Sequence, residues 1–84
     1  MNFEKGNLLI VDDEEEIVTL ISRSLENLAN KIFLALNGKE ALNIINKETL
    51  HCVICDIKMP GMDGITVIKE TRKSGNKVPF IFFT

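Results

Sequence analysis

Four short apolar runs recur along the chain at similar spacing, with amphipathic helical patterns between them. The runs are Leu8–Val11, Ile32–Leu36, Val53–Cys55 and Phe80–Phe83. The first, third and fourth are continuously apolar, which is typical of strands covered on both faces of a parallel sheet. Strands that alternate with helices favour parallel pairing through right-handed crossovers. The sequence therefore predicts one α/β domain with the element order β-α-β-α-β-α-β.

Three helical patterns fill the intervals between the apolar runs. The second follows a break at Asn37-Gly38 and extends from about Lys39 to Lys47, and the third begins near Asp63 or Gly64 and ends around Ser74-Gly75-Asn76. Helical spacing predicts which residues of the three patterns face inward. They are, in chain order, Ile17, Leu20, Ile21, Ser24, Leu25 and Leu28; Ala41, Leu42 and Ile45; and Ile65 and Ile68.

Length and charge narrow the classes of function. The 84 residues make one small domain, with a net charge of −2 and a pI of about 5.3. Lys and Arg are scattered without a basic run, so neither a direct nucleic-acid role nor binding to an anionic membrane has electrostatic support. No apolar stretch approaches the length of a membrane span, and the N-terminus lacks the layout of a signal peptide. We therefore expect a cytoplasmic protein.

The two cysteines, Cys52 and Cys55, have a spacing that occurs in zinc and redox sites. Here they lie in a predicted strand, where residues three apart point to opposite faces, so the thiols cannot easily share a metal or form a disulfide. We interpret both as small buried core residues. We expect His51, directly before them, to be a loop or strand-edge residue rather than a ligand.

Three aspartates follow predicted strands and carry the main functional signal. Asp12 and Asp13 come directly after the first apolar run, and Asp56 comes after the third. Parallel strands place their carboxyl ends along one edge, where open α/β sheets bind ligands. Three carboxylates that meet there repel one another, so the cluster takes up protons or recruits a cation. An all-oxygen site of this kind suits Mg²⁺ together with phosphate, which points to phosphoryl chemistry.

Other acidic residues have simpler structural explanations. Glu14–Glu16 fall in a predicted first helical turn, where negative charge complements the helix dipole. Asp63 is expected to cap the next helix. Asp56 by itself could equally be a turn residue before the Pro60-Gly61 loop. Thr84 ends the fourth run and would place a hydroxyl beside the acidic cluster, where it could hold an oxygen of a phosphoryl group.

In this order and spacing, the motifs resemble the receiver domains of bacterial two-component response regulators, of which the chemotaxis regulator is the best-known single-domain member. The resemblance covers roughly residues 6–84. It rests on the acidic pair, on ALNGKEAL (Ala35 to Leu42), on DIKMPGMDG (Asp56 to Gly64) and on Thr84. It implies a flavodoxin-like, doubly wound parallel sheet of strand order 2-1-3-4-5.

The resemblance also implies roles for individual residues. Asp56 would be the phosphoacceptor, taking a phosphoryl group from a sensor histidine kinase, a phosphotransfer protein or a small donor such as acetyl phosphate. Asp13 would bind Mg²⁺ directly and Asp12 mainly through water, while Asp56 and the backbone carbonyl of Lys58 would complete the protein ligands. Thr84 would hydrogen-bond the phosphoryl group. Such a domain is a phosphoacceptor that signals by conformational change, not an enzyme, apart from its own phosphorylation and dephosphorylation.

The chain departs from the family pattern after Thr84. Residues 1–84 correspond to a truncated receiver domain that lacks the last helix-strand-helix, including the family's essential lysine, for which Lys58 cannot be assumed to substitute. We therefore expect impaired phosphorylation, while Mg²⁺ binding survives. We also expect self-association, as a dimer, through the exposed fourth strand or the open sheet face.

Two other functions stay open. The first is a receiver-like interaction or oligomerisation module that is not phosphorylated. The second, a metal-dependent phosphatase with an aspartate nucleophile, is weaker, because such an enzyme would usually need an acid at the position of Lys58. A P-loop or dinucleotide fingerprint is not found in the sequence.

Overall fold

The computed structural model describes residues 5–83 and contains one four-stranded parallel sheet. The strands are β1 (Gly6–Val11), β2 (Ala29–Ala35), β3 (Cys52–Asp56) and β4 (Phe80–Phe83). The helices between them are α1 (Glu15–Leu25), α2 (Gly38–Lys47) and α3 (Gly64–Lys73). The predicted element order is confirmed. The first three strands extend beyond their predicted starts, β2 ends one residue before Leu36, and Asp56 is the last residue of β3 rather than the residue after it.

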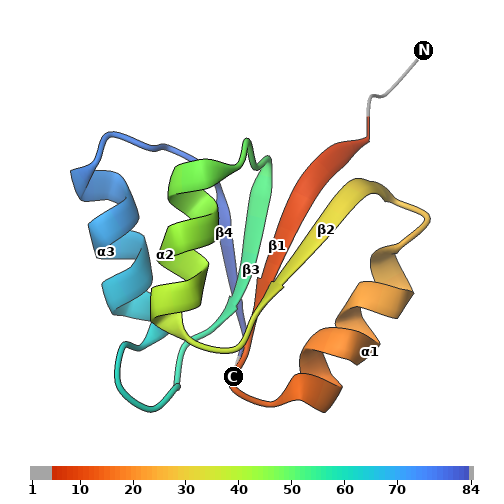
Figure 1. The fold of residues 1–84 in the computed structure, drawn as a ribbon, viewed down its shortest axis with the longest axis horizontal. Coiled ribbons are helices and arrows are strands. Elements are labelled where there is room, and N and C mark those ends of the chain that lie inside the picture. The colour runs from red at the N-terminus through yellow and green to blue at the C-terminus, as the bar shows by residue number, and fades with distance from the viewer. Residues whose placement is uncertain (1–4, 84) are drawn as a thin grey trace.

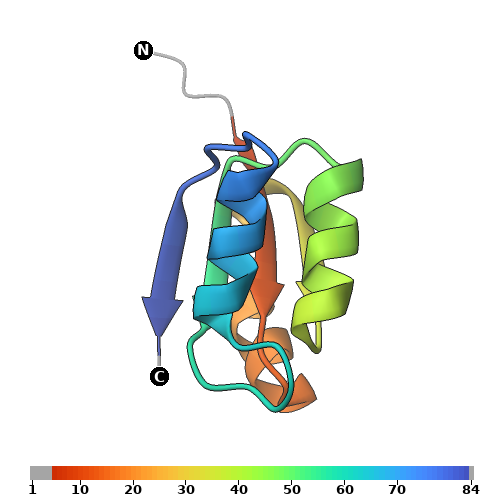
Figure 2. The same ribbon diagram turned by 90° about the vertical axis from the view of Figure 1, so that its left-hand side faces the viewer.

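The sheet has the strand order β2-β1-β3-β4, with helices on both faces. Figure 1 shows α2 and α3 on one side of the sheet and α1 on the other, and Figure 2 shows α2 and α3 side by side in front of the strands. This is the doubly wound arrangement that right-handed crossovers produce. Within the described residues, none of the helices is long and apolar enough to cross a membrane.

The larger part of the core lies between the sheet and the pair α2 and α3. Side chains alternate between the two faces of each strand, so Leu9 and Val53, which pair in register, both point to this side. From the helices, Ala41 and Ile45 of α2 and Val67 of α3 close the cluster, each at most 2% exposed. The inward positions predicted for Ala41 and Ile45 are confirmed.

The face that helix α1 turns to the sheet overlaps only partly with the face that the sequence pattern predicted. Val18 is its buried residue, whereas Leu20 is 63% exposed and Leu28, which lies beyond the end of the helix, is 70% exposed. Leu20 is two residues from Val18, or about 200° around a helix of 3.6 residues per turn, so the two cannot share a face. The predicted inward positions of Leu20, Ser24 and Leu28 are wrong, whereas Ile17, Ile21 and Leu25 are half-buried.

In α3 the prediction also chose the wrong residue at the start of the helix. Ile65 is 40% exposed and Ile68 is half-buried, whereas Val67 and Thr71 form the buried stripe. The hydroxyl of Thr71 donates a hydrogen bond of 2.8 Å to the carbonyl of Val67. This bond lets a polar side chain take a core position, which a search for apolar residues overlooks.

Side-chain caps fix the starts of two helices. Asn37 accepts the backbone N–H of Glu40 at 2.8 Å, and Glu40 accepts the N–H of Leu36 at 2.9 Å, which satisfies donors on both sides of the start of α2. Asp63 accepts the N–H of Thr66 at 2.8 Å, which confirms its predicted capping role and lowers its pKa. Helix α1 begins after Glu14 without a side-chain cap.

The two cysteines are free thiols in unequal surroundings. Cys55 is fully buried in the main core, as predicted, but Cys52 on the opposite face is only half-buried, so that part of the prediction is wrong. Burial, with a smaller contribution from the nearby carboxylate of Asp56, raises the pKa of Cys55 to about 12. A thiol that stays protonated is a poor metal ligand. His51 precedes β3, and its Nδ1 accepts the N–H of Asn7 at 2.9 Å, which agrees with a strand-edge role.

Two alanine substitutions in α1 test which face of the helix is buried. Val18→Ala removes a side chain that is 1% exposed and should lower the free energy of unfolding by about 2 kcal/mol. Leu20→Ala removes a larger side chain that is 63% exposed and should change it by less than about 0.5 kcal/mol. Urea unfolding followed by circular dichroism measures both. The opposite ranking would mean that α1 packs through its Leu20 face.

Candidate metal and phosphoryl site

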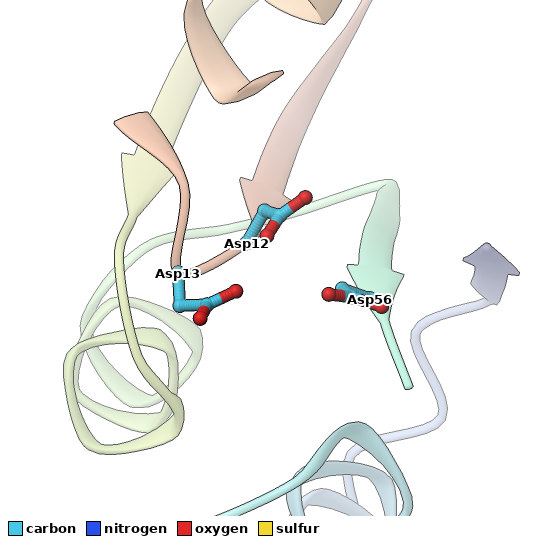
Figure 3. A group of neighbouring side chains, drawn as sticks. All are labelled: Asp12, Asp13 and Asp56. Carbon is cyan, nitrogen blue, oxygen red and sulfur yellow. The ribbon is translucent and has the colours of Figure 1, made fainter. Parts of the chain in front are cut away.

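The three predicted site aspartates meet at the carboxyl edge of the sheet. Strands β1 and β3 are parallel neighbours, and Val11 pairs with Cys55, so Asp12 and Asp56 follow at the same level. One carboxylate oxygen from each of Asp12, Asp13 and Asp56 lies within 4.8 Å of the others. In Figure 3 the carboxylates of Asp13 and Asp56 point toward one another across a gap, with Asp12 beside them. The predicted convergence of the three aspartates is confirmed.

Their burial and hydrogen bonds differ. Asp12 is 4% exposed, Asp56 is half-buried and Asp13 is exposed. Oδ1 of Asp12 accepts the backbone N–H of Glu14 at 3.1 Å, and Oδ1 of Asp56 accepts the N–H of Lys58 at 3.2 Å. Each is a side-chain bond to the backbone two residues on, which fixes the orientation of the carboxylate from its own loop.

Burial raises the pKa of Asp12 from an ordinary 3.8 to about 6. The hydrogen bond from Glu14 opposes this rise, and the carboxyl groups of Asp13 and Asp56 add to it because a further negative charge beside them is unfavourable. An ionised Asp12 is therefore costly in the metal-free protein at neutral pH. A cation between the three carboxylates would remove this cost.

The geometry fits a small divalent cation. Two oxygens bound directly to one Mg²⁺ lie at most about 4.2 Å apart, twice the usual bond of 2.0–2.1 Å. The limit of 4.8 Å among the three carboxylates is only slightly wider. The cluster needs little movement to share one ion, or none if one carboxylate reaches the ion through water. Oxygen donors without a nearby histidine or ionised thiol favour Mg²⁺ over zinc.

The loop after Asp56 is tied to the structure at several points. The N–H of Ile57 donates to the carbonyl of Phe83 at 3.0 Å, which joins the loop to the end of β4. The side chain of Met59 is buried in the core, and Gly61 turns the chain with a φ of 77°. Lys58 is exposed, and a role for its backbone carbonyl stays a prediction. Thr84 lies outside the described residues.

Backbone atoms make contacts at the site that the sequence did not predict. The N–H groups of Glu14 and Lys58 donate to the aspartates, and Gly64 packs closely against the carbonyl of Asp56. Side-chain chemistry gives no signal for such contacts. A glycine directly after a helix cap is the one sequence feature that could have pointed to the last of them.

Comparison with known proteins agrees with this geometry. The family described as the response regulator receiver domain matches residues 8–84. The chain belongs to this family. Receiver domains are signalling modules that work with histidine kinases or phosphotransfer proteins, and are not classical enzymes.

Individual relatives support the assignment to the receiver family. The chain is 42% identical over 92% of its length to the uncharacterized transcriptional regulatory protein YrkP of Bacillus subtilis, and 36% identical over the same share to the alkaline phosphatase synthesis regulator PhoP of that species. It spans 32% of each of these two relatives.

Solved structures show the same architecture. The receiver domain of the Francisella response regulator 1452 superposes with a TM-score of 0.83 at 33% identity, covering 92% of this chain and 64% of that one. The chemotaxis protein CheY4 of Vibrio cholerae gives 0.86 at 27% identity, covering 94% of this chain and 68% of that one. The flavodoxin-like fold predicted from the sequence is confirmed.

Replacing Asp12 by Asn tests the electrostatic cost of the cluster. The folded-state pKa lies above the unfolded value, so the folded protein binds more protons between pH 3.8 and about 6, and Asp12 lowers stability as pH rises through this range. Asp12→Asn keeps the acceptor for Glu14 without the charge. In Mg²⁺-free buffer it should raise the free energy of unfolding at pH 7 by roughly 1–3 kcal/mol.

The same comparison at two pH values isolates Asp12 from other acidic groups. The stability difference between Asp12→Asn and the native chain should shrink toward zero near pH 4, where folded Asp12 is protonated. Urea unfolding in the presence of a chelator measures it. A difference that is absent at pH 7, or equally large at pH 4, would contradict the raised pKa.

Proposed function

We propose that this chain accepts a phosphoryl group on Asp56 from a phosphohistidine of a sensor kinase or phosphotransfer protein, in a Mg²⁺-dependent reaction. The convergence of Asp12, Asp13 and Asp56 within 4.8 Å at the carboxyl edge of the sheet is the observation that carries the proposal. Membership of the receiver family supports the same reaction. The proposed phosphoryl transfer takes place in the cytoplasm, where kinases form phosphohistidine from ATP.

Of the three carboxylates, that of Asp56 is the proposed nucleophile. An oxygen of Asp56 bonds to phosphorus as the phosphorus–nitrogen bond of the donor breaks, and the released imidazole takes up a proton. The N–H of Lys58, which donates to Oδ1 of Asp56, keeps the carboxylate oriented for this attack. Bound Mg²⁺ would supply positive charge that lets an anionic carboxylate meet an anionic phosphoryl group.

Asp13, Asp12 and the carbonyl of Lys58 are the other proposed metal ligands, with Asp12 acting mainly through water. Exposed Asp13 would offer a carboxylate oxygen to an ion from the solvent side, and buried Asp12, oriented by its hydrogen bond from Glu14, would offer one from the sheet edge. The hydroxyl of Thr84 is proposed to hydrogen-bond the phosphoryl group. The product is a modified signalling domain, so the chain acts on itself rather than on a pool of substrate.

Phosphorylation of Asp56 is tested by intact mass after incubation with Mg²⁺ and acetyl phosphate. We expect the native chain to gain one phosphoryl group and Asp56→Asn to gain none, because the amide is not a nucleophile at neutral pH. A chelator should abolish the gain. The time course of the mass gain gives the rate of phosphorylation.

Two controls make the outcome decisive. Circular dichroism establishes that both proteins are folded, and Glu15→Gln, which removes an exposed charge from α1, should react like the native chain. A folded native chain that gains no phosphoryl group, or an Asp56→Asn variant that gains one, would contradict the proposed acceptor.

A second candidate function is self-association, which the exposure of β4 favours. Within residues 5–83, β4 pairs with β3 alone and presents its other edge. Its sequence, FIFF, contains no charge or proline to oppose pairing with another strand. Ile81 is 58% exposed on the face where α1 covers β1 and β2, so both the edge and the adjoining face of β4 offer apolar surface to a second copy.

A charge on β4 tests this candidate. Ile81→Lys should convert an associating chain to a monomer, because lysine on an edge strand opposes pairing with another strand. Leu28→Lys is the matched control, since Leu28 is 70% exposed but lies between α1 and β2. Light scattering over a concentration series measures both. A native chain that stays monomeric at the highest concentration would rule the candidate out.

A further inference from the structure

The loop of residues 57–63, which joins β3 to α3, is closed at its base by direct backbone contact. The N–H of Gly64 donates to the carbonyl of Ile57 at 2.9 Å. A Cβ built on Gly64 would collide with the carbonyl oxygen of Asp56 and would lie 3.1 Å from Cα of Ile57. The first residue of α3 therefore rests on the peptide group that follows Asp56.

The obstacle at Gly64 is backbone, so no change of rotamer could relieve it. Gly64 does not have a positive φ, and it is the close approach that requires glycine there. Gly61 in the same loop is the reverse case. Its φ of 77° is strained for other residues, but a Cβ there would meet nothing within 4 Å.

A second glycine, Gly38 at the start of α2, lies close against the same loop. A Cβ on Gly38 would lie 2.8 Å from Cβ of Met62 and 2.9 Å from its carbonyl oxygen. The loop of residues 57–63 is thus packed against the first residues of both α2 and α3. Each of these two residues lacks the side chain that would push the loop away.

We infer that Gly64 is a positioning residue for Asp56, with Gly38 supporting the same loop through Met62. This inference rests on the proposed metal and phosphoryl function. The Asp56 carboxylate is held by its own peptide, against which Gly64 packs, and by the N–H of Lys58, which directly follows the Ile57 that Gly64 also contacts. A side chain at Gly64 would move this segment by several tenths of an ångström. That is comparable with the margin between the 4.8 Å limit and the oxygen spacing that Mg²⁺ requires.

The test compares Gly64→Ala with Gly61→Ala in the full 84-residue chain. Alanine is a good helix former at the first position of α3, so Gly64→Ala adds the collision without weakening the helix. Gly61→Ala strains the same loop without a collision. Titration with Mg²⁺, followed by the amide NMR signals of Asp13 and Lys58, should give a dissociation constant about 10- to 100-fold higher for Gly64→Ala. Gly61→Ala should bind like the native chain, and equal affinity in all three proteins would overturn the inference.

A metal-free measurement separates this inference from the proposed function. The amide signal of Lys58, which reports its hydrogen bond to Asp56, should shift in Gly64→Ala and stay in place in Gly61→Ala without any Mg²⁺. If the native chain does not bind Mg²⁺, the proposed function fails and the Lys58 signal alone decides the role of Gly64. If Gly64→Ala does not fold, Gly38→Ala takes its place: weaker Mg²⁺ binding or a shifted Lys58 signal supports the inference, and neither change overturns it.

Discussion

The parallel pairing of β1 with β2 on one side and β3 on the other is the constraint on which the rest of the structure depends. It buries Leu9, Ile10 and Val11 completely and fixes Val11 as the last residue of β1. The chain must then turn at Asp12, whose N–H extends the ladder to the carbonyl of Ala35 at 3.2 Å. The site is thus a product of strand register, because a slip of one residue would exchange the faces of the sheet and move Asp12 away from Asp56.

This constraint places the carboxylate of Asp12 in a buried position, where its negative charge is unfavourable in the metal-free fold. Asp12 is confined by the same backbone that forms the core, and among residues 5–83 the N–H of Glu14 is the one donor that compensates its burial. Asp13, one residue further, is exposed. Two adjacent residues of one type therefore differ: an ionised Asp12 is unfavourable in the metal-free protein because it is buried, whereas Asp13 is open to solvent.

The sequence was sufficient for the topology and for the meeting of the three aspartates, because both follow from the order of strands and helices. It was insufficient for the face of α1, where Leu20 fits an apolar stripe as well as Val18 and only packing against β1 and β2 decides between them. Thr71 was overlooked because its burial depends on a hydrogen bond to Val67. The contacts of Gly38 and Gly64 arise between segments whose separation in space no local pattern specifies.

One backbone hydrogen bond links the acidic edge of the sheet to the end of β4, the two surfaces for which functions are proposed. The N–H of Ile57, in the peptide directly after Asp56, is bound to the carbonyl of Phe83 at the end of β4. The end of β4 cannot shift without carrying that peptide along or breaking the bond. A second chain bound to β4 and a phosphoryl group on Asp56 would therefore both act on the peptide that joins Asp56 to Ile57. If one alters the affinity for the other, thermodynamic linkage requires that the effect be equal in both directions.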